Sequence, residues 1–128
     1  FAGPKSAKGL AVAQLIADEA CCGPFVFGAA APQGWREIDL ARHRVQAVVR
    51  GADGRAPLER DGDGGAALGD PRIALTWLVN ELSSLGLTLE VGQFVSTGTC
   101  MVPLEVEPGD AVHADFGVLG ALALRLTA

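Results

Sequence analysis

The sequence predicts a small α+β fold in which β-strands dominate. One strong helix signal lies between residues 71 and 85, and short runs of β-favouring residues separated by glycine- and proline-rich turns lie before and after it. The chain has 128 residues, of which 49% are hydrophobic and 20% charged, so it has room for one hydrophobic core. We therefore predict a single domain over residues 1–128.

The helix prediction rests on its two ends and on its apolar spacing. Asp70 can accept hydrogen bonds from the free N–H groups of the first turn, Pro71 fits that turn, and Gly86 favours a stop. Apolar residues recur at intervals of three and four and predict one buried stripe: Ile73, Ala74, Trp77, Leu78, Leu82 and Leu85. Within that stripe, burial of Trp77 is expected to contribute most.

Strands are expected on both sides of the helix. Residues 44–50 partly alternate polar and apolar side chains and predict a hairpin with residues 55–59, followed by a flexible polar loop over 61–65. Further short strands are predicted by β-favouring or alternating runs at residues 25–27, 87–90, 94–95, 103–106, 111–116 and 119–127. A proline-glycine centre at Pro108-Gly109 favours a type II turn. Residues 10–16 are compatible with a short helix or with a buried loop.

Composition excludes several classes of function. A formal net charge of −5 argues against nucleic-acid binding, which depends on many Lys and Arg residues. No uncharged apolar run is long enough to span a membrane. The three cysteines, Cys21, Cys22 and Cys100, are odd in number and lack zinc-binding spacing, which favours a reducing, cytoplasmic location. Because the chain begins at Phe1, we expect a fragment, a processed chain or an incomplete record.

Short segments spread along nearly the whole chain carry a resemblance to a known family. They are residues 16–21, 25–28, 67–71, 76–80, 95–99, 108–110, 114–116 and 119–120. Their order and spacing resemble the C-terminal part of the 2-keto-4-pentenoate hydratase and 4-oxalocrotonate decarboxylase branch of the fumarylacetoacetase family. The resemblance implies a fumarylacetoacetase C-terminal-like domain, truncated on its N-terminal side. Its fold would be a mixed, coiled β-sheet or β-roll with one long outer helix over about residues 71–85.

The resemblance also implies an activity. Its first implication is a hydro-lyase that adds water to 2-hydroxypenta-2,4-dienoate-like products of aromatic ring cleavage, acting on a small 2-oxo or 2-hydroxy acid as a cytoplasmic homo-oligomer. One alternative is a 4-oxalocrotonate-type decarboxylase of the same fold. Another is a noncatalytic subunit or degenerate homologue.

A divalent metal, magnesium or manganese, is part of what the resemblance implies. In the family it is held by a Glu-x-Glu pair and a further Glu, and this chain resembles the part that follows those ligands. Metal ligands are therefore expected to be absent here, and this chain would supply only part of the site. Glu105-Val106-Glu107 has the bare pattern in another context, and we interpret it as solvated charge at a strand end.

The resemblance places substrate-binding residues in two segments. Asp18 and Cys21 match an Asp and a Ser of the family, and Thr97-Gly98-Thr99 matches the loop that approaches the substrate carboxylate. Cys21 replaces a hydroxyl with a weaker thiol donor, and a packing role is the alternative. For the two threonines the alternative is hydroxyls satisfied by neighbouring backbone.

No catalytic residue is assigned from the sequence. His43 and His113 lack a suggestive partner in the sequence and are expected to be surface or hydrogen-bonded histidines. Lys5 and Lys8, in a glycine-rich opening segment, are expected to be solvated.

Overall fold

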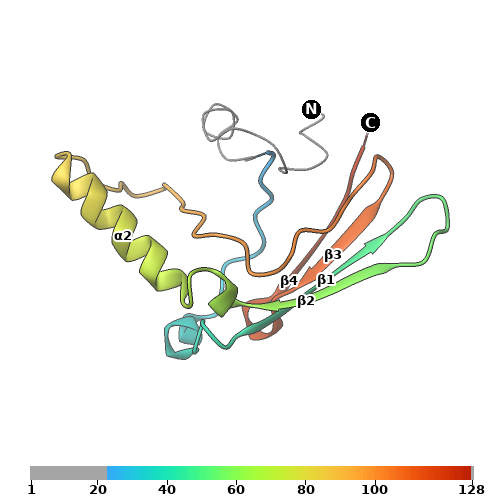
Figure 1. Ribbon diagram of the computed structural model, residues 1–128, viewed down its shortest axis with the longest axis horizontal. Helices are drawn as coiled ribbons and strands as arrows, with labels where there is room; N and C mark the ends of the chain where they lie inside the picture. Colours follow the sequence, from blue (N-terminus) through green and yellow to red (C-terminus); the bar gives the residue numbers. More distant parts are fainter. Residues whose placement is uncertain (1–22, 128) are drawn as a thin grey trace.

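The computed structural model describes residues 23–127 as an α+β unit, with a four-stranded antiparallel sheet and one helix of 14 residues (Figure 1). The elements are β1 (Arg44–Arg50), β2 (Leu58–Asp63), α2 (Pro71–Ser84), β3 (Ala111–Asp115) and β4 (Ala121–Arg125). Their order across the sheet is β2-β1-β3-β4. The described residues also form three short 3-10 helices: η2 (Gln33–Glu37) before β1, η3 (Gly64–Ala66) between β2 and α2, and η4 (Gly117–Leu119) between β3 and β4.

The predicted hairpin after residue 44 is confirmed, but its second strand is wrong in position, because it runs over Leu58–Asp63 and not over residues 55–59. β1 pairs antiparallel with β2, with Val48 opposite Glu59 and Val45 opposite Gly62. The predicted loop over 61–65 is wrong in its first half, because residues 61–63 belong to β2. β2 lies at the edge of the sheet, so its backbone pairs with β1 while its charged side chains remain in water, and a polar run can therefore form a strand there.

The predicted C-terminal strands are also confirmed. β3 pairs antiparallel with β4, with Val112 opposite Leu124 and Ala114 opposite Leu122. β3 pairs on its other side with β1, where Val49 lies opposite Val112. This pairing joins two hairpins that are distant in sequence and places β1 in the interior of the sheet.

The buried apolar residues lie mainly on β1. Val45, Ala47 and Val49 alternate along one side of this strand and are at most 7% exposed, and Ala67 is the fourth buried apolar residue within residues 23–127. β1 and β3 are both paired on two edges, and among the four strands the buried apolar residues belong to β1 alone.

Both predicted ends of α2 are confirmed. The Asp70 carboxylate accepts a hydrogen bond of 2.8 Å from the N–H of Arg72, and Pro71 occupies the first turn. At the other end, the N–H of Leu87 donates to the carbonyl of Leu82 at 2.9 Å, and Gly86 has φ of 70°. This is a Schellman ending, in which a left-handed glycine lets the chain turn back.

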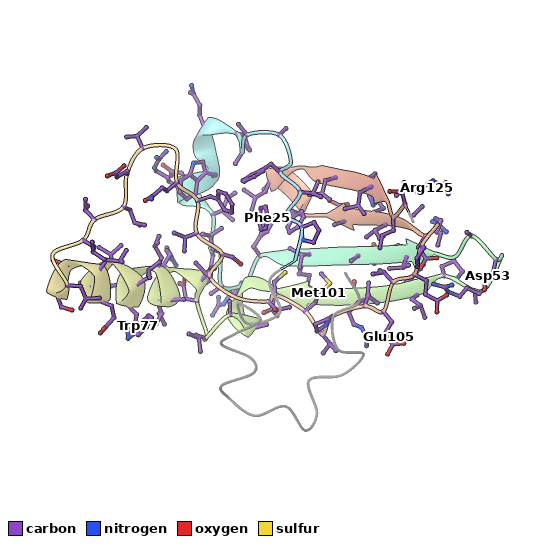
Figure 2. The ribbon with its side chains drawn as sticks, turned by 90° about the horizontal axis from the view of Figure 1, so that it is seen from above. Phe25, Asp53, Trp77, Met101, Glu105 and Arg125 are labelled. Atoms are coloured by element: carbon purple, nitrogen blue, oxygen red, sulfur yellow. The ribbon has the colours of Figure 1, made fainter. Side chains whose placement is uncertain are left out.

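The predicted burial of one apolar stripe on α2 is wrong for this chain. Ile73, Trp77 and Leu85 are 56%, 63% and 71% exposed, whereas Ala74, Leu78 and Leu82 are partly buried. Figure 1 shows α2 extending away from the sheet, and Figure 2 shows Trp77 on the outside of the helix. The apolar spacing is present, and the segment after the helix lies beside part of it, at Leu78 and Leu82.

Several predicted strands do not form among the described residues. The runs at 25–27, 87–90, 94–95 and 103–106 have no strand assignment, and every strand pair in the sheet is antiparallel, so the mixed sheet implied by the resemblance is not seen there. Phe25 and Phe27 instead stack with Phe94, at ring-centroid distances of 5.1 and 4.6 Å. β-favouring side chains do not form a strand without a backbone partner. Residues 10–16 lie outside the described part.

Candidate functional site

The Thr97-Gly98-Thr99 loop, which we name the threonine loop, is anchored beside the end of β2. The N–H of Asp63 donates to the carbonyl of Cys100, the next residue after the loop, at 3.0 Å. A side chain at Gly62 would overlap that same carbonyl. The close approach of Cys100 to β2 therefore requires glycine at position 62, and it fixes where the loop ends.

The middle of the threonine loop rests on the turn that precedes α2. Gly98 has φ of 136°, and a Cβ atom added there would lie 3.5 Å from the Cβ of Ala67. Ala67 is 6% exposed, and the neighbouring Leu68 is a non-glycine residue with positive φ, at 59°. Two segments that the resemblance treats separately, 67–71 and 95–99, are thus brought into contact.

The side chains of the threonine loop are available as hydrogen-bond donors. Thr97 is partly buried and Thr99 is exposed. Within residues 23–127, no hydrogen bond engages either hydroxyl or the N–H of Gly98. The backbone partners considered as an alternative for the two threonines are therefore not found in the described part of the chain.

The other two predicted substrate-binding residues, Asp18 and Cys21, lie outside the described residues. Their predicted roles remain predictions, and so does the alternative that Cys21 is a packing residue. Cys100 is described: it is partly buried, and this burial raises the pKa of its thiol. A thiol with a raised pKa is a poor nucleophile, so Cys100 is suited to packing and to carrying the anchoring carbonyl.

Two carboxylates organise the backbone next to the threonine loop. Asp63 accepts a hydrogen bond of 3.1 Å from the N–H of Ala66 and so begins η3. Asp70 accepts from the Nε and the backbone N–H of Arg72, and these bonds lower the pKa of Asp70. Each carboxylate therefore stabilises the first turn of the helix that follows it, η3 for Asp63 and α2 for Asp70. The role of Asp63 was not predicted, although an Asp before Gly-Gly is a signal for a cap.

The most buried ionic contact in the described structure joins Arg55 to Asp110. Asp110 is 1% exposed, and its Oδ2 accepts from the guanidinium of Arg55 and from the N–H of Glu107 at 2.9 Å. The backbone N–H of Glu107 and the charge of Arg55 lower the pKa of Asp110. The pair ties the turn that contains Gly109, where φ is 94°, to the loop after β1. Sequence reasoning found the turn and missed the partner.

The two histidines behave as the sequence predicts. The Nε2 of His43 donates to the carbonyl of Phe116 at 2.6 Å, so this ring is hydrogen-bonded where the turn after β3 begins. His113 is exposed on β3. Neither arrangement points to catalysis.

The carboxylates of the described structure do not gather around a common point. Among residues 23–127, no group of three or more His, Cys, Asp or Glu side chains is placed to hold a metal ion. The Glu107 carboxylate is 74% exposed and lies 3.5 Å from Arg55, so the Glu105-Val106-Glu107 pattern does not form a ligand pair. These residues do not fit a divalent cation.

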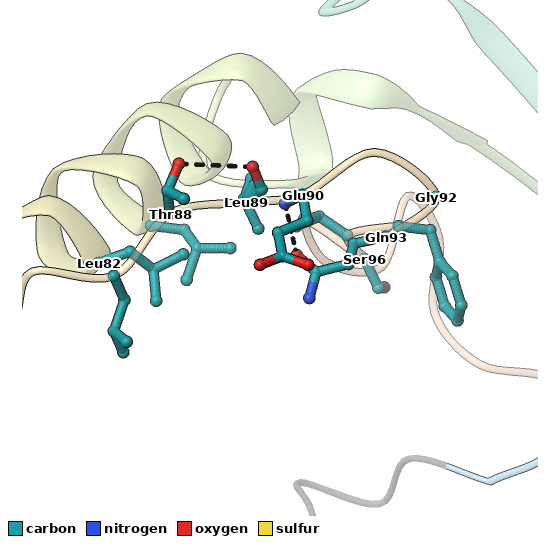
Figure 3. Close-up of a pocket in the computed structure, with 11 residues that line it drawn as sticks. Leu82, Thr88, Leu89, Glu90, Gly92, Gln93 and Ser96 are labelled. Carbon is teal, nitrogen blue, oxygen red and sulfur yellow. Dashed lines mark hydrogen bonds between the residues drawn. The ribbon is translucent and has the colours of Figure 1, made fainter.

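An open groove runs between the C-terminal half of α2 and the segment that follows it (Figure 3). It is lined mainly by hydrocarbon: Leu78, Leu82, Leu87, Leu89, Phe94 and Val95. The polar residues that line the groove are spread along the irregular segment after α2, where the N–H of Glu90 donates to Oε1 of Gln93 at 2.8 Å. The groove reaches Ser96, next to the threonine loop, but its chemistry suits an apolar occupant and not a carboxylate.

Comparison with known proteins agrees with the order of motifs in the chain. A 2-keto-4-pentenoate hydratase of Burkholderia vietnamiensis is 36% identical over 112 residues, which are 88% of this chain and 40% of that protein. A 2-keto-4-pentenoate hydratase of Paraburkholderia xenovorans is 31% identical over 107 residues, 84% of this chain and 38% of the relative. This chain is homologous to part of the 2-keto-4-pentenoate hydratases.

The chain is also similar, at lower identity, to a hydratase named for a different substrate. A 2-hydroxyhexa-2,4-dienoate hydratase of Comamonas testosteroni is 26% identical over 116 residues, 91% of this chain and 42% of that protein. The chain thus spans about two-fifths of the length of the curated relatives it matches. No family model matches the chain. Within residues 23–127, no helix has both the length and the hydrophobicity needed to cross a membrane.

Proposed function

We propose that this chain forms the carboxylate-binding side of a hydratase site that adds water to 2-hydroxypenta-2,4-dienoate-like acids. The observation that carries the proposal is the threonine loop: it is anchored at Cys100, packed on Ala67, and presents two hydroxyls and one N–H without partners among the described residues. Homology to 2-keto-4-pentenoate hydratases supplies the substrate class.

The chemistry of such a loop suits a carboxylate. An anion that leaves water must regain hydrogen bonds, and hydroxyl or N–H donors aimed at a carboxylate give short, charge-assisted bonds. Gly98 has no side chain, so an acid can approach the backbone there. In this role the threonine loop would bind and orient the acid, and no proton-transfer step is assigned to it.

The rest of the reaction is not assigned to the described residues. A magnesium or manganese ion, as the resemblance implies, would polarise the 2-oxo acid when bound. Residues 23–127 do not bring together ligands for it. The proposal therefore gives this chain a share in substrate binding and derives no step through the metal.

The first test is binding of an unreactive 2-oxo acid, 2-oxopentanoate, followed by amide chemical shifts of the ¹⁵N-labelled chain. We expect shifts at Thr97, Gly98 and Thr99. The double substitution Thr97→Val with Thr99→Val removes two hydroxyls without changing side-chain shape. Loss of a hydrogen bond to a charged group costs about 1.5–3 kcal/mol, so Kd should rise roughly tenfold or more.

The matched control is Thr88→Val, because Thr88 is an exposed threonine outside the threonine loop whose hydroxyl donates to a backbone carbonyl. Its Kd should equal that of the unchanged chain. Shifts that avoid residues 97–99, or a double variant that binds as well as the control, would exclude the proposed role.

A second assay follows the absorbance of 2-hydroxypenta-2,4-dienoate in the presence of magnesium or manganese. Binding without turnover by this chain supports a partial site. Turnover by the chain alone would contradict the partial site and place metal ligands within it. Absence of both binding and turnover would favour a noncatalytic homologue.

A further inference from the structure

The helix α2 has apolar side chains around more of its surface than the other described residues bury. Beside the partly buried Leu78 and Leu82, exposed apolar side chains lie on both flanks: Ile73, Leu75, Trp77 and Val79 are 56%, 38%, 63% and 45% exposed. A helix that is hydrophobic around most of its circumference is normally buried. The described chain therefore leaves most of this helix without its expected contacts.

The apolar surface continues beyond the helix. Leu85, Leu87 and Phe94 are 71%, 57% and 59% exposed, and the last two also line the groove beside Leu78 and Leu82 (Figure 3). Exposed apolar patches of this extent mark interaction sites when they are contiguous. We name the helix α2 and the groove residues 87–95 together the α2 surface.

We propose that the α2 surface is a docking surface for polypeptide homologous to the part of the hydratases that this chain does not match. The matched part is only 38–42% of each relative, so more than half of those proteins is other polypeptide, available in them to cover the same helix. The inference rests on this homology and on the exposed residues, and it does not depend on the proposed carboxylate-binding role.

The contact predicted to matter most is Trp77. Its ring is the largest exposed side chain on α2, and buried tryptophans are the residues that most often dominate interface energies. The rim of the groove carries Glu90, so an apolar segment with a basic residue at its edge would be the best fit.

The test is co-expression of the tagged 128-residue chain with the unmatched part of the Paraburkholderia xenovorans hydratase. A positive control pairs that same part with its own matched 107 residues. We expect recovery of both polypeptides in equal amounts. The substitution Trp77→Ser, at an exposed position, should reduce recovery by about tenfold or more. Glu59→Gln, at an exposed position on β2 and outside the α2 surface, should leave recovery unchanged.

Three results would overturn the proposal. They are recovery that Trp77→Ser leaves unchanged, no recovery with this chain although the positive control forms its complex, and light scattering that shows Trp77-dependent self-association in place of the complex. None of these readouts uses 2-oxo acid binding or turnover, so failure here is separate from failure of the proposed function.

Discussion

At the residue scale, the feature with the clearest physical consequence is the buried carboxylate of Asp110. It is ionised in a site with little water, and the Glu107 N–H and the Arg55 guanidinium compensate for the lost hydration. Such a pair gives little net stability compared with an apolar pair, but removing one member leaves the other uncompensated. The pair should therefore be sensitive to substitution and to acid.

We predict that Asp110→Asn lowers the melting temperature by several degrees at pH 7, because Arg55 loses its buried counter-ion. The pKa of Asp110 is lowered in the folded chain, so its contribution is fully present above the unfolded value of about 3.9. The contribution is lost as pH falls through the folded pKa. The difference between Asp110→Asn and the unchanged chain should therefore shrink on acidification.

The measurement is thermal unfolding by circular dichroism from pH 7 to pH 3. Glu107→Gln is the matched control, because it removes an exposed carboxylate 3.5 Å from the same Arg55 while its backbone N–H still reaches Asp110, and an exposed ion pair contributes little to stability. A difference for Asp110→Asn that stays constant over this range would contradict the assignment.

At the scale of elements, strands and turns whose partners are close in sequence were well predicted. The β1–β2 and β3–β4 hairpins and both ends of α2 depend on short-range chemistry, such as the Asp70 cap and the left-handed Gly86. The threonine loop was predicted from resemblance alone. Its supports, Gly62 and Ala67, are more than 25 residues away along the chain, and no local pattern indicates which segments will meet.

We predict that Gly62→Ala destabilises the chain by roughly 1–3 kcal/mol, the usual cost of overpacking. Its methyl group would overlap the backbone carbonyl of Cys100, so either β2 or the end of the threonine loop must move. Urea unfolding measures the loss. Gly34→Ala is the control, because no atom lies near its added methyl and its φ is not positive. Equal midpoints for the two variants would show that the contact is absent in solution.

At the scale of the whole molecule, stability is unevenly distributed. The buried apolar residues lie on or near the sheet, with Val49 at 1% exposure, while α2 extends from it with its apolar side chains largely in water (Figure 1). Regions with few buried contacts open more easily than the core of a sheet. The helix and the sheet should therefore differ in how readily their hydrogen bonds break.

We predict that amide hydrogen exchange of this chain is slowest in β1 and much faster in α2. β1 is paired on both edges and holds most of the core, whereas the capping of α2 by Asp70 and Gly86 secures only its ends. Exchange followed by NMR gives the rate at each amide. If the polypeptide proposed to cover the α2 surface is bound, protection of α2 should rise while that of β1 changes little. Protection of α2 in the chain alone that equals that of β1 would contradict this picture.

The sequence by itself determined the helix and its ends, both hairpins and the turn before β3, because each of these depends on neighbouring residues. It also determined the homology to hydratases, which depends on the order of the motifs along the chain. Only the tertiary structure decided which strands pair across the sheet, that Asp110 is buried against Arg55, and that Gly98 rests on Ala67. It also decided that Trp77 is exposed. The spacing of apolar residues predicts which face of a helix can be buried, whereas burial itself requires another segment to pack against that face.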